Sequence, residues 1–338
     1  GKGETVNLLN EWMDPRHIVA DAFGPPSDEE SARPPMWRFW RALPPKGKIG
    51  VFFGSWYTMP IVNRVLEHYN DNDLQKSLDE IFRHEKMLVD EGVLLIKFWF
   101  HLSKNQQRKR LKSLEADPKT RWRVSKDDWR RFKVYDEFRE ISEHALRETS
   151  TAGAPWIVIS GADHRYRSLT AGRILLEQLK RRIADGAQKE KKVDAAPPMP
   201  QLDNLKLLRS LDMTQRLEKK RYDKSLERYQ GELNVFSRSK AVRKHSVILV
   251  FEGWDAGGKG SAIRRITSAL DARQYHIVPI AAPTEEERAQ PYLWRFWRHI
   301  PGKGGVTIFD RSWYGRVLVE RVEGFCSQAD WMRAYSEI

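Results

Sequence analysis

Short apolar runs alternate with amphipathic stretches along this chain. The runs have the length and the β-branched content of buried strands: VLLIKFWFHLS (93–103), APWIVIS (154–160), SVILVFEG (246–253), YHIVPIAA (275–282) and GVTIFD (305–310). Helical periodicity lies between them, as in AIRRITSALD (262–271) and in SLTAGRILLEQLKRRI, which ends near Ile183. Strands that alternate with helices and are apolar throughout predict an α/β fold with a mainly parallel sheet.

The middle of the chain has a different pattern. Residues 195–204 read AAPPMPQLDN, which is typical of a Pro-rich linker. Leucines then recur at helical spacing from Leu205 through Leu208, Leu211 and Leu217 to Leu233. We expect one or two helices that lead into the segment beginning at SVILVFEG.

One phrase is written twice. RFWRALPPKGKIGVFFGSWY (38–57) is followed 257 positions later by RFWRHIPGKGGVTIFDRSWY (295–314). Aligned at that offset without gaps, residues 1–65 match residues 258–322 at 25 positions. The period is far too long for a solenoid and predicts a duplicated domain.

The duplication predicts the domain boundaries. We expect a first domain over 1–184, a linker over 185–204 and a second domain over 205–338. The first copy contains a long segment after the repeated part, and the second copy stops near the corresponding point. We therefore expect a fragment that begins inside one domain and ends inside the next, so that both copies are truncated.

The net charge and the composition narrow the range of binding partners and cellular compartments. The chain has 59 Lys and Arg against 46 Asp and Glu, a net charge of +13, which favours a polyanionic partner such as nucleic acid, an anionic membrane or a phosphate polymer. The single Cys326 excludes an intramolecular disulfide and fits a reducing compartment, so we expect a cytoplasmic location. No apolar run reaches about 18 residues, so no membrane span is predicted.

A glycine-rich loop follows the strand at 246–253. In EGWDAGGKGSAIRR (252–265), Gly253, Gly258 and Lys259 fit the phosphate-loop spacing, although Gly260 stands at the usual Ser or Thr position and Ser261 one residue later. Converging backbone N–H groups at a helix N-terminus favour bound phosphate over the alternative of a plain glycine-rich turn. Asp255 is unusual in such a loop, because it would repel phosphate unless it held Mg²⁺ or oriented a group.

The strand at 305–310 ends in an acid, where a phosphate-loop enzyme places its metal carboxylate. Asp310 is that candidate, and Arg311 follows as a cation for phosphoryl oxygens. Arg316 and Glu320 are spaced i, i+4, so that pair fits a surface salt bridge as well as it fits a functional role.

The first copy shares the aromatic residues of the second copy and lacks its charged residues. Trp37, Phe39, Trp40, Phe52, Ser55, Trp56 and Tyr57 are shared, and we expect the aromatic residues to form core and packing contacts. Opposite Asp310, Arg311, Arg316 and Glu320 stand Phe53, Gly54, Met59 and Asn63, and opposite Ser261 stands Glu4. We therefore predict that the first copy is structural and the second catalytic.

These motifs together resemble the polyphosphate kinase 2 family. EGWDAGGKGS and FDRSWYGRVLVERV carry the resemblance, which covers nearly the whole chain, and the tandem arrangement is similar to the class that phosphorylates AMP with inorganic polyphosphate. The resemblance implies a phosphate-loop NTPase-like α/β/α sandwich with a helical lid, similar to thymidylate kinase. The lid of the second copy would lie past Ile338. In the first copy its equivalent is 106–131, which is rich in basic residues and which we interpret as a structural remnant.

The resemblance also implies roles for individual residues. The catalytic set would be Asp255, Lys259, Asp310 and Arg311, with Asp310 and Asp255 holding Mg²⁺. The phosphate and nucleotide would be bound by Gly253, Gly257, Gly258, Gly260, Ser261, Arg316 and Glu320. We expect inorganic polyphosphate and AMP or ADP as partners, no membrane or nucleic acid, and association into a homo-oligomer.

Two other functions stay open at this stage. One is the same fold with ATP or GTP as donor, or with ADP as acceptor. The other is a non-catalytic basic scaffold that binds nucleic acid. The presence of both Lys259 and Asp310 disfavours it.

Overall fold

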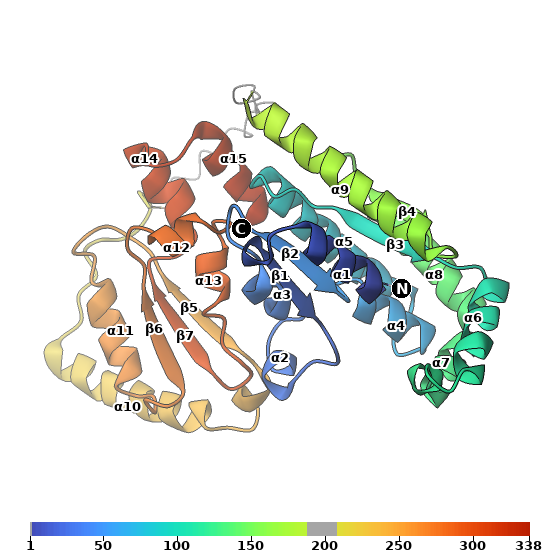
Figure 1. The fold of residues 1–338 in the computed structure, drawn as a ribbon. Helices are drawn as coiled ribbons and strands as arrows, with labels where there is room; N and C mark the ends of the chain where they lie inside the picture. The colour runs from blue at the N-terminus through green and yellow to red at the C-terminus, as the bar shows by residue number, and fades with distance from the viewer. Residues whose placement is uncertain (1, 188–207) are drawn as a thin grey trace. The chain divides into compact units, whose positions relative to one another are not determined.

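The computed structural model describes residues 2–187 and 208–338. The chain divides into two compact units (Figure 1). Unit 1 contains residues 1–25, 42–189 and 289–291, and unit 2 contains residues 26–41, 190–288 and 292–338. The predicted linker 185–204 lies for the most part outside the described residues, and the domain boundaries stay a prediction.

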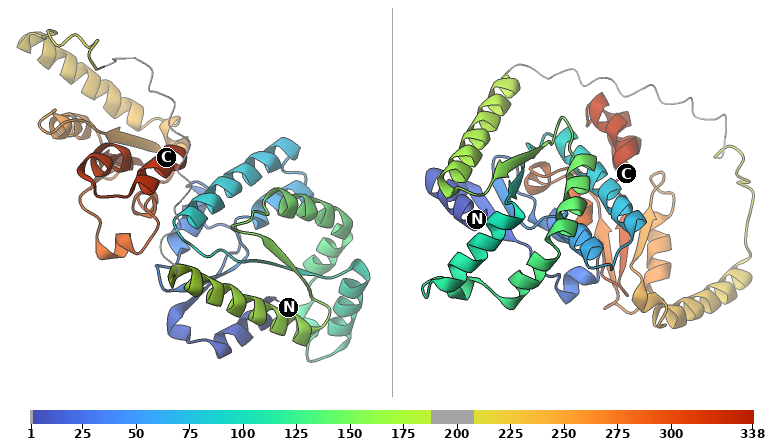
Figure 2. Two further views of the ribbon diagram at one scale, coloured as in Figure 1. Left: turned by 90° about the horizontal axis from the view of Figure 1, so that it is seen from above. Right: turned by 90° about the vertical axis from the view of Figure 1, so that its right-hand side faces the viewer.

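Unit 1 contains four strands, in two parallel pairs, within its described part. Its elements are α1 (Lys2–Trp12), η1 (Pro15–His17), β1 (Ile18–Ala22), β2 (Ile49–Phe53), α4 (Thr58–Val65), α5 (Asp71–Asp90), β3 (Lys97–His101), α6 (Lys104–Ala116), η2 (Arg121–Arg123), α7 (Lys126–Lys133), α8 (Tyr135–Glu148), β4 (Trp156–Ser160) and α9 (His164–Ala187). β1 pairs with β2, and β3 pairs with β4. Figure 2 shows α6, α7 and α8 grouped at one end of this unit.

Unit 2 is built on a three-stranded parallel sheet in the order β5-β7-β6. Its elements are α2 (Asp28–Ser31), α3 (Trp37–Ala42, whose last residue belongs to unit 1), α10 (Lys219–Ser237), η3 (Val242–Lys244), β5 (Val247–Phe251), α11 (Lys259–Thr267), β6 (Tyr275–Pro279), α12 (Glu285–Arg288), α13 (Trp294–Trp297), β7 (Val306–Asp310), η4 (Arg316–Glu320), α14 (Arg321–Glu323) and α15 (Gln328–Glu337). The predicted α/β class and the parallel sheet are confirmed.

Both faces of this sheet are covered. On one face, Ile263 of α11 packs against Val306 and Ile308. On the other face, Phe296 of α13 packs against Val278 and Phe309. The central strand β7 is therefore packed against helices on both of its faces, as a continuous apolar run predicts.

The sequence repeat is also a structural repeat. Ile18 pairs with Ile49 in β1–β2, and Tyr275 pairs with Val306 in β6–β7, which is the same register at an offset of 257. Ion pairs recur as well: Arg38 lies 3.3 Å from Glu30, and Arg295 lies 3.3 Å from Glu287. The duplication predicted from the sequence is therefore confirmed in the fold.

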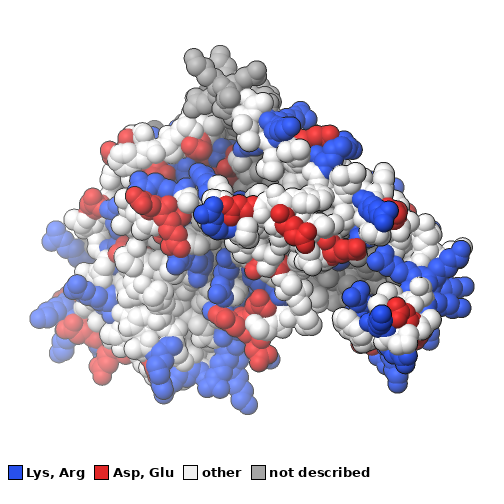
Figure 3. All heavy atoms as spheres, viewed as in Figure 1, with Lys and Arg blue, Asp and Glu red and all other residues white. Residues whose placement is uncertain are grey.

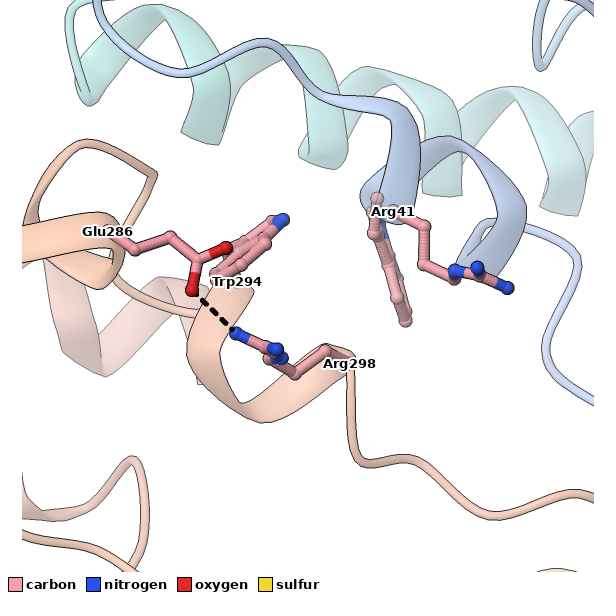
Figure 4. Close-up of a pocket in the computed structure, with 5 residues that line it drawn as sticks. Arg41, Glu286, Trp294 and Arg298 are labelled. Atoms are coloured by element: carbon pink, nitrogen blue, oxygen red, sulfur yellow. Dashed lines mark hydrogen bonds and ion pairs between the residues drawn. The ribbon is translucent and has the colours of Figure 1, made fainter. Parts of the chain in front are cut away.

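The shared aromatic residues are largely packing residues, as predicted. Trp37, Phe39, Trp56 and Tyr57 are all at most 7% exposed. Within unit 2, Trp40 stacks on Trp297 with ring centroids 4.5 Å apart. A small pocket of about 130 Å³ beside this stack is lined by Trp40, Arg41, Glu286, Trp294 and Arg298 (Figure 4). Glu286 and Arg298 are paired at 3.3 Å there, so their charges already compensate each other.

One predicted helix is shorter than expected. The leucine spacing predicted one or two helices between Leu205 and Leu233. Leu205 lies outside the described residues, and from residue 208 onward the helix in this span is α10, which begins at Lys219. Leu208, Leu211 and Leu217 precede it and are each more than half exposed. The Asp212 carboxylate accepts hydrogen bonds from the backbone N–H and the hydroxyl of Thr214, a local turn that competes with helix formation.

Candidate functional site

The phosphate loop connects the end of β5 to the start of α11. Gly253 has a φ of +137°, and Gly258 has a φ of +88° at the N-cap of α11. A side chain at Gly257 would meet the carbonyl oxygen of Trp254 at 3.0 Å. Other residues would be strained or crowded at these positions, so glycine favours this loop shape, which leaves the N-terminus of α11 open to an anion.

Asp310 lies in the same pocket as the loop. This pocket of about 390 Å³ is lined by Ala256, Gly257, Gly258, Lys259, Gly260, Ser261, Arg264 and Asp310. Asp310 is the last residue of β7, which pairs directly with β5, so the sheet register places Phe251 opposite Asp310. Five predicted phosphate-loop residues and the predicted metal carboxylate thus meet at one edge of the sheet.

Lys259 is folded back onto the loop. Its Nζ donates to the carbonyl oxygens of Gly253, at 2.8 Å, and of Trp254, at 2.9 Å. These carbonyls neutralise no charge, so the ammonium remains available to a phosphate group that enters the pocket.

Arg311 pairs with Asp255. The Arg311 guanidinium donates to Asp255 Oδ1 at 2.9 Å, and the Asp255 side chain is 90% exposed. An exposed pair of this kind contributes about 0–1 kcal/mol to stability, so a ligand phosphate can compete for Arg311 at little cost.

The backbone of Arg311 is strained. Its φ is +65°, in the left-handed region that residues other than glycine rarely adopt. The corresponding Gly54 has a φ of +68°. Such strain costs on the order of 1 kcal/mol and is concentrated at functional sites, where the surrounding structure maintains it.

Arg316 and Glu320 form a separate cluster. Arg316 Nε lies 3.2 Å from Glu320, and the Arg316 guanidinium lies 3.8 Å from the centre of the Tyr292 ring. Burial raises the pKa of the Glu320 carboxyl, and the nearby Arg316 opposes this shift. The i, i+4 ion pair that the spacing predicted is therefore present. Neither residue lines the phosphate pocket, and a role in binding the nucleotide stays a prediction.

This cluster lies in a π-helix. η4 covers Arg316–Glu320, whereas the corresponding Met59–Asn63 of the first copy lies inside the regular helix α4. A π-helical turn is rare and is frequently found at functional sites. The difference between the copies at these positions is therefore in the backbone as well as in the charges.

Sequence reasoning missed two residues. Arg264 lines the phosphate pocket one helical turn after Gly260, a position that the i, i+4 spacing of α11 could have identified. Glu252 Oε1 accepts hydrogen bonds from both the backbone N–H and the hydroxyl of Ser312, each at 2.7 Å. Glu252 thereby holds the residue that follows Arg311, and no local sequence pattern indicates this contact between two strand ends.

The first copy has a different arrangement at the corresponding helix. At the N-terminal turn of α1, Glu4 stands where α11 has Ser261, and its carboxylate is bound by Arg167 of α9 at 2.6 Å. The Arg167 side chain is 1% exposed. An internal carboxylate thus lies where the second copy presents an open helix N-terminus.

A metal site is compatible with these residues. Within residues 2–187 and 208–338 there is no group of three or more His, Cys, Asp or Glu side chains that could hold an ion by themselves. Mg²⁺ is typically bound by one or two carboxylates together with substrate phosphates, and Asp310 in the pocket of the phosphate loop fits that pattern. To bind the ion as well, the Asp255 carboxylate would have to give up its ion pair with Arg311.

Comparison with known proteins identifies the family of this chain. The family profile of polyphosphate kinase 2 matches residues 1–187 and 216–338. This chain belongs to the polyphosphate kinase 2 family. The family resemblance drawn from the two phosphate motifs is confirmed, and the family indicates metal-dependent phosphoryl transfer of the kinase type.

Relatives match over the whole chain. It is 59% identical to a polyphosphate:AMP phosphotransferase of Pseudomonas aeruginosa and 54% identical to one of Pseudomonas syringae, each over 338 residues. The chain spans 68% of the length of both. It also resembles a solved polyphosphate kinase 2 structure from Pseudomonas aeruginosa, with 55% identity and a TM-score of 0.86 over 100% of this chain and 65% of the other. The predicted fold of a duplicated phosphate-loop kinase is confirmed.

No helix among the described residues is long and apolar enough to cross a membrane.

Proposed function

We propose that the second copy transfers the terminal phosphate of inorganic polyphosphate to AMP, giving ADP. The observation that carries this proposal is the shared pocket of Asp310 and the phosphate loop, which places a carboxylate beside an anion-binding helix N-terminus. The relatives named polyphosphate:AMP phosphotransferase support the choice of donor and acceptor.

Residues of the pocket and the neighbouring pair of Arg311 and Asp255 have proposed roles. The N–H groups of the loop and Lys259 bind the phosphoryl group that is transferred, while Arg264 adds a cation at the wall of the pocket. Arg311 leaves Asp255 and binds the acceptor phosphate. Mg²⁺ would be held by Asp310, with Asp255 as a second carboxylate, and would neutralise charge on donor and acceptor phosphates. Catalysis then rests on positioning and on charge stabilisation.

The first copy is proposed to be structural. It has Phe53 opposite Asp310, and its Glu4 and Arg167 already neutralise each other at the helix N-terminus. It therefore lacks both the metal carboxylate and an open anion site. The domain boundaries at 184 and 205, homo-oligomer formation and the cytoplasmic location stay predictions.

The test uses the protein expressed from its complete gene. It is incubated with Mg²⁺ and polyphosphate, with AMP or ADP as acceptor, and the nucleotides are quantified by chromatography beside the Asp310→Asn variant. We expect ADP from AMP, and a loss of at least about 100-fold in the variant. Product with ATP but not with polyphosphate as donor would overturn the proposal in favour of an ordinary nucleotide kinase.

ADP as the acceptor is the second candidate. ATP formed from ADP, at a rate above that of ADP formed from AMP, would keep the donor and the site and replace only the acceptor. Omission of Mg²⁺ should abolish either reaction.

A further inference from the structure

Basic residues are concentrated in one part of unit 1. Residues 104–133, which form α6, η2 and α7 and are called the basic hairpin below, contain twelve Lys and Arg against four Asp and Glu. This segment therefore carries a net charge of +8 of the +13 of the whole chain. Figure 3 shows Lys and Arg side chains gathered over this part of the surface.

Most of these charges have no acidic partner. Lys104 pairs with Asp136, and Arg130 pairs with Asp127 at 3.0 Å. Among the described residues, the other ten Lys and Arg side chains of the basic hairpin lie beyond ion-pair distance of a carboxylate: Arg108, Lys109, Arg110, Lys112, Lys119, Arg121, Arg123, Lys126, Arg131 and Lys133. All of them except Arg110 are classed as exposed.

Like charges are aligned along α6. Lys104, Arg108 and Lys112 are spaced i, i+4, i+8, so they lie on one face about 6 Å apart along the helix axis. Like-charged side chains at this spacing destabilise a helix, and of the three, within the described part of the chain, only Lys104 is paired with a carboxylate. The arrangement is unfavourable for the isolated protein and becomes favourable when a polyanion lies along the row.

The fold nevertheless fixes the two helices. α6 begins with a capping box of Ser103 and Gln106, and α7 begins with one of Ser125 and Asp128. Phe132 of α7 is 7% exposed and anchors that helix in the hairpin. The cations are thus presented on pre-formed helices, and a ligand would have little backbone to order on binding.

We propose that the basic hairpin is a docking surface for inorganic polyphosphate, distinct from the phosphate loop. The sequence-based interpretation of 106–131 as a structural remnant leaves these unpaired charges without a role, and this proposal replaces it. The proposal rests on the proposed function for the identity of the polymer. A donor long enough to reach both surfaces would gain avidity, because its second contact would be intramolecular.

The chemistry favours polyphosphate over RNA. Single-stranded nucleic acid is bound by basic grooves with several exposed aromatic rings on which bases stack. In the basic hairpin only Trp122, which is 74% exposed, is an exposed aromatic residue. Its indole N–H donates to the Lys119 carbonyl, and the Arg123 guanidinium covers its ring at 5.1 Å. The surface thus offers charge without a stacking platform.

The test compares two triple variants with the same loss of charge. Lys109→Ala/Lys112→Ala/Lys119→Ala removes three exposed cations of the basic hairpin, and Lys219→Ala/Lys220→Ala/Lys224→Ala removes three exposed cations of α10. Both are made in the protein expressed from its complete gene and checked by circular dichroism. Initial rates are measured with tripolyphosphate and with a polymer of about 100 phosphates as donor.

We expect the basic-hairpin variant to raise KM for the long polymer about 10-fold, with kcat and KM for tripolyphosphate within about 2-fold of the parent. The α10 variant should change neither. An unchanged KM for the long polymer, or an equal rise for the short donor, would overturn the proposal.

Direct binding separates this proposal from the proposed function. Fluorescently labelled polyphosphate is titrated into the Lys259→Ala protein, with and without the basic-hairpin substitutions, at several salt concentrations. We expect weaker binding and a smaller salt dependence when the three lysines are absent, whether or not the enzyme uses this donor. Loss of affinity for a labelled RNA, with polyphosphate binding unchanged, would assign the surface to nucleic acid instead.

Discussion

The turns that follow β2 and β7 have the same backbone and different chemistry. Gly54 and Arg311 both have φ near +65°, at +68° and +65°. Glycine adopts this conformation without strain, whereas Arg311 adopts it at a cost on the order of 1 kcal/mol. The second copy has a strained arginine where the first copy has glycine, which is expected if the guanidinium serves a function there.

The serine that follows each turn donates its backbone N–H to a different partner in the two copies. The Ser55 N–H donates to the hydroxyl of Thr58 at 3.2 Å, a contact inside the turn itself. The Ser312 N–H donates instead to Glu252, which comes from the neighbouring strand end. The second turn is thus tied to the start of the phosphate loop. The comparison of Gly54 with Arg311 teaches that the duplicated fold supplies the same backbone, and that the side chain placed on it differs in chemistry.

The test with the largest expected effect compares substitutions of the two equivalent lysines. Lys259→Ala should lower turnover by at least about 100-fold, because it removes a cation from the transferred phosphate. Lys2→Ala, at the equivalent position of the first copy, should leave turnover within a few fold. Steady-state rates with polyphosphate and AMP measure both. Equal losses in the two variants would refute the assignment of catalysis to the second copy alone.

The second test concerns the stability of unit 1. Burial lowers the pKa of His84 to about 3, from about 6.5 in the unfolded chain. The unfolded chain therefore takes up the proton more readily, and this contribution to stability, fully present above pH 6.5, is lost as the pH falls toward 3. The loss is about 2 kcal/mol at pH 5.

Urea unfolding between pH 5 and pH 7 measures this effect. His84→Asn should flatten the pH dependence by about that amount, and phosphotransfer at pH 7.5 should persist, since the residue lies in the copy that we propose to be structural. A pH dependence identical to that of the parent would show that His84 is not the titrating group.

The third test concerns Glu252 as a positioning residue. Glu252→Ala should lower kcat about 10-fold, because Ser312, and with it Arg311, loses its anchor. Glu252→Gln should recover most of the activity, since a single oxygen accepts both hydrogen bonds. Ser55→Ala is the matched control in the first copy and should be neutral. If the glutamine variant is as impaired as the alanine variant, then charge matters at this position and the anchoring explanation fails.

The smallest expected effect is the strain at Arg311. Arg311→Gly should be more stable than Arg311→Ala by about 1 kcal/mol, because only glycine adopts this φ without strain. Both variants should lose activity to a similar extent. Thermal unfolding compares the two, and equal stabilities would mean that the surroundings do not enforce the left-handed conformation.

A large part of the fold was predictable from the sequence. Apolar runs of strand length bracketed by helical periodicity predicted the parallel α/β layers, and the offset of 257 predicted the duplicated register that β1–β2 and β6–β7 show. Of the predicted one or two helices before β5, α10 is present, whereas residues 208–218 are not helical and contain the Asp212 turn. Local hydrogen bonding overrode periodicity at that point.

The candidate site was predictable only in part. The glycine and lysine spacing identified the phosphate loop, and the acid at the end of β7 identified Asp310, because both motifs are contiguous in sequence. Arg264 and Glu252 were missed, since their roles depend on which side chains face the pocket and on which strand end lies beside which.

The sequence by itself determined the class of fold, the repeat and the residue types available for phosphate chemistry, because these follow from local spacing and from self-comparison. Only the tertiary structure decided that Arg311 is strained and paired with Asp255, that Arg316 lies with Glu320 away from the phosphate pocket, and that Glu4 of the first copy is bound by Arg167. The reason is physical: these features join residues far apart in the chain, and their energies depend on burial and on distances that no local pattern encodes.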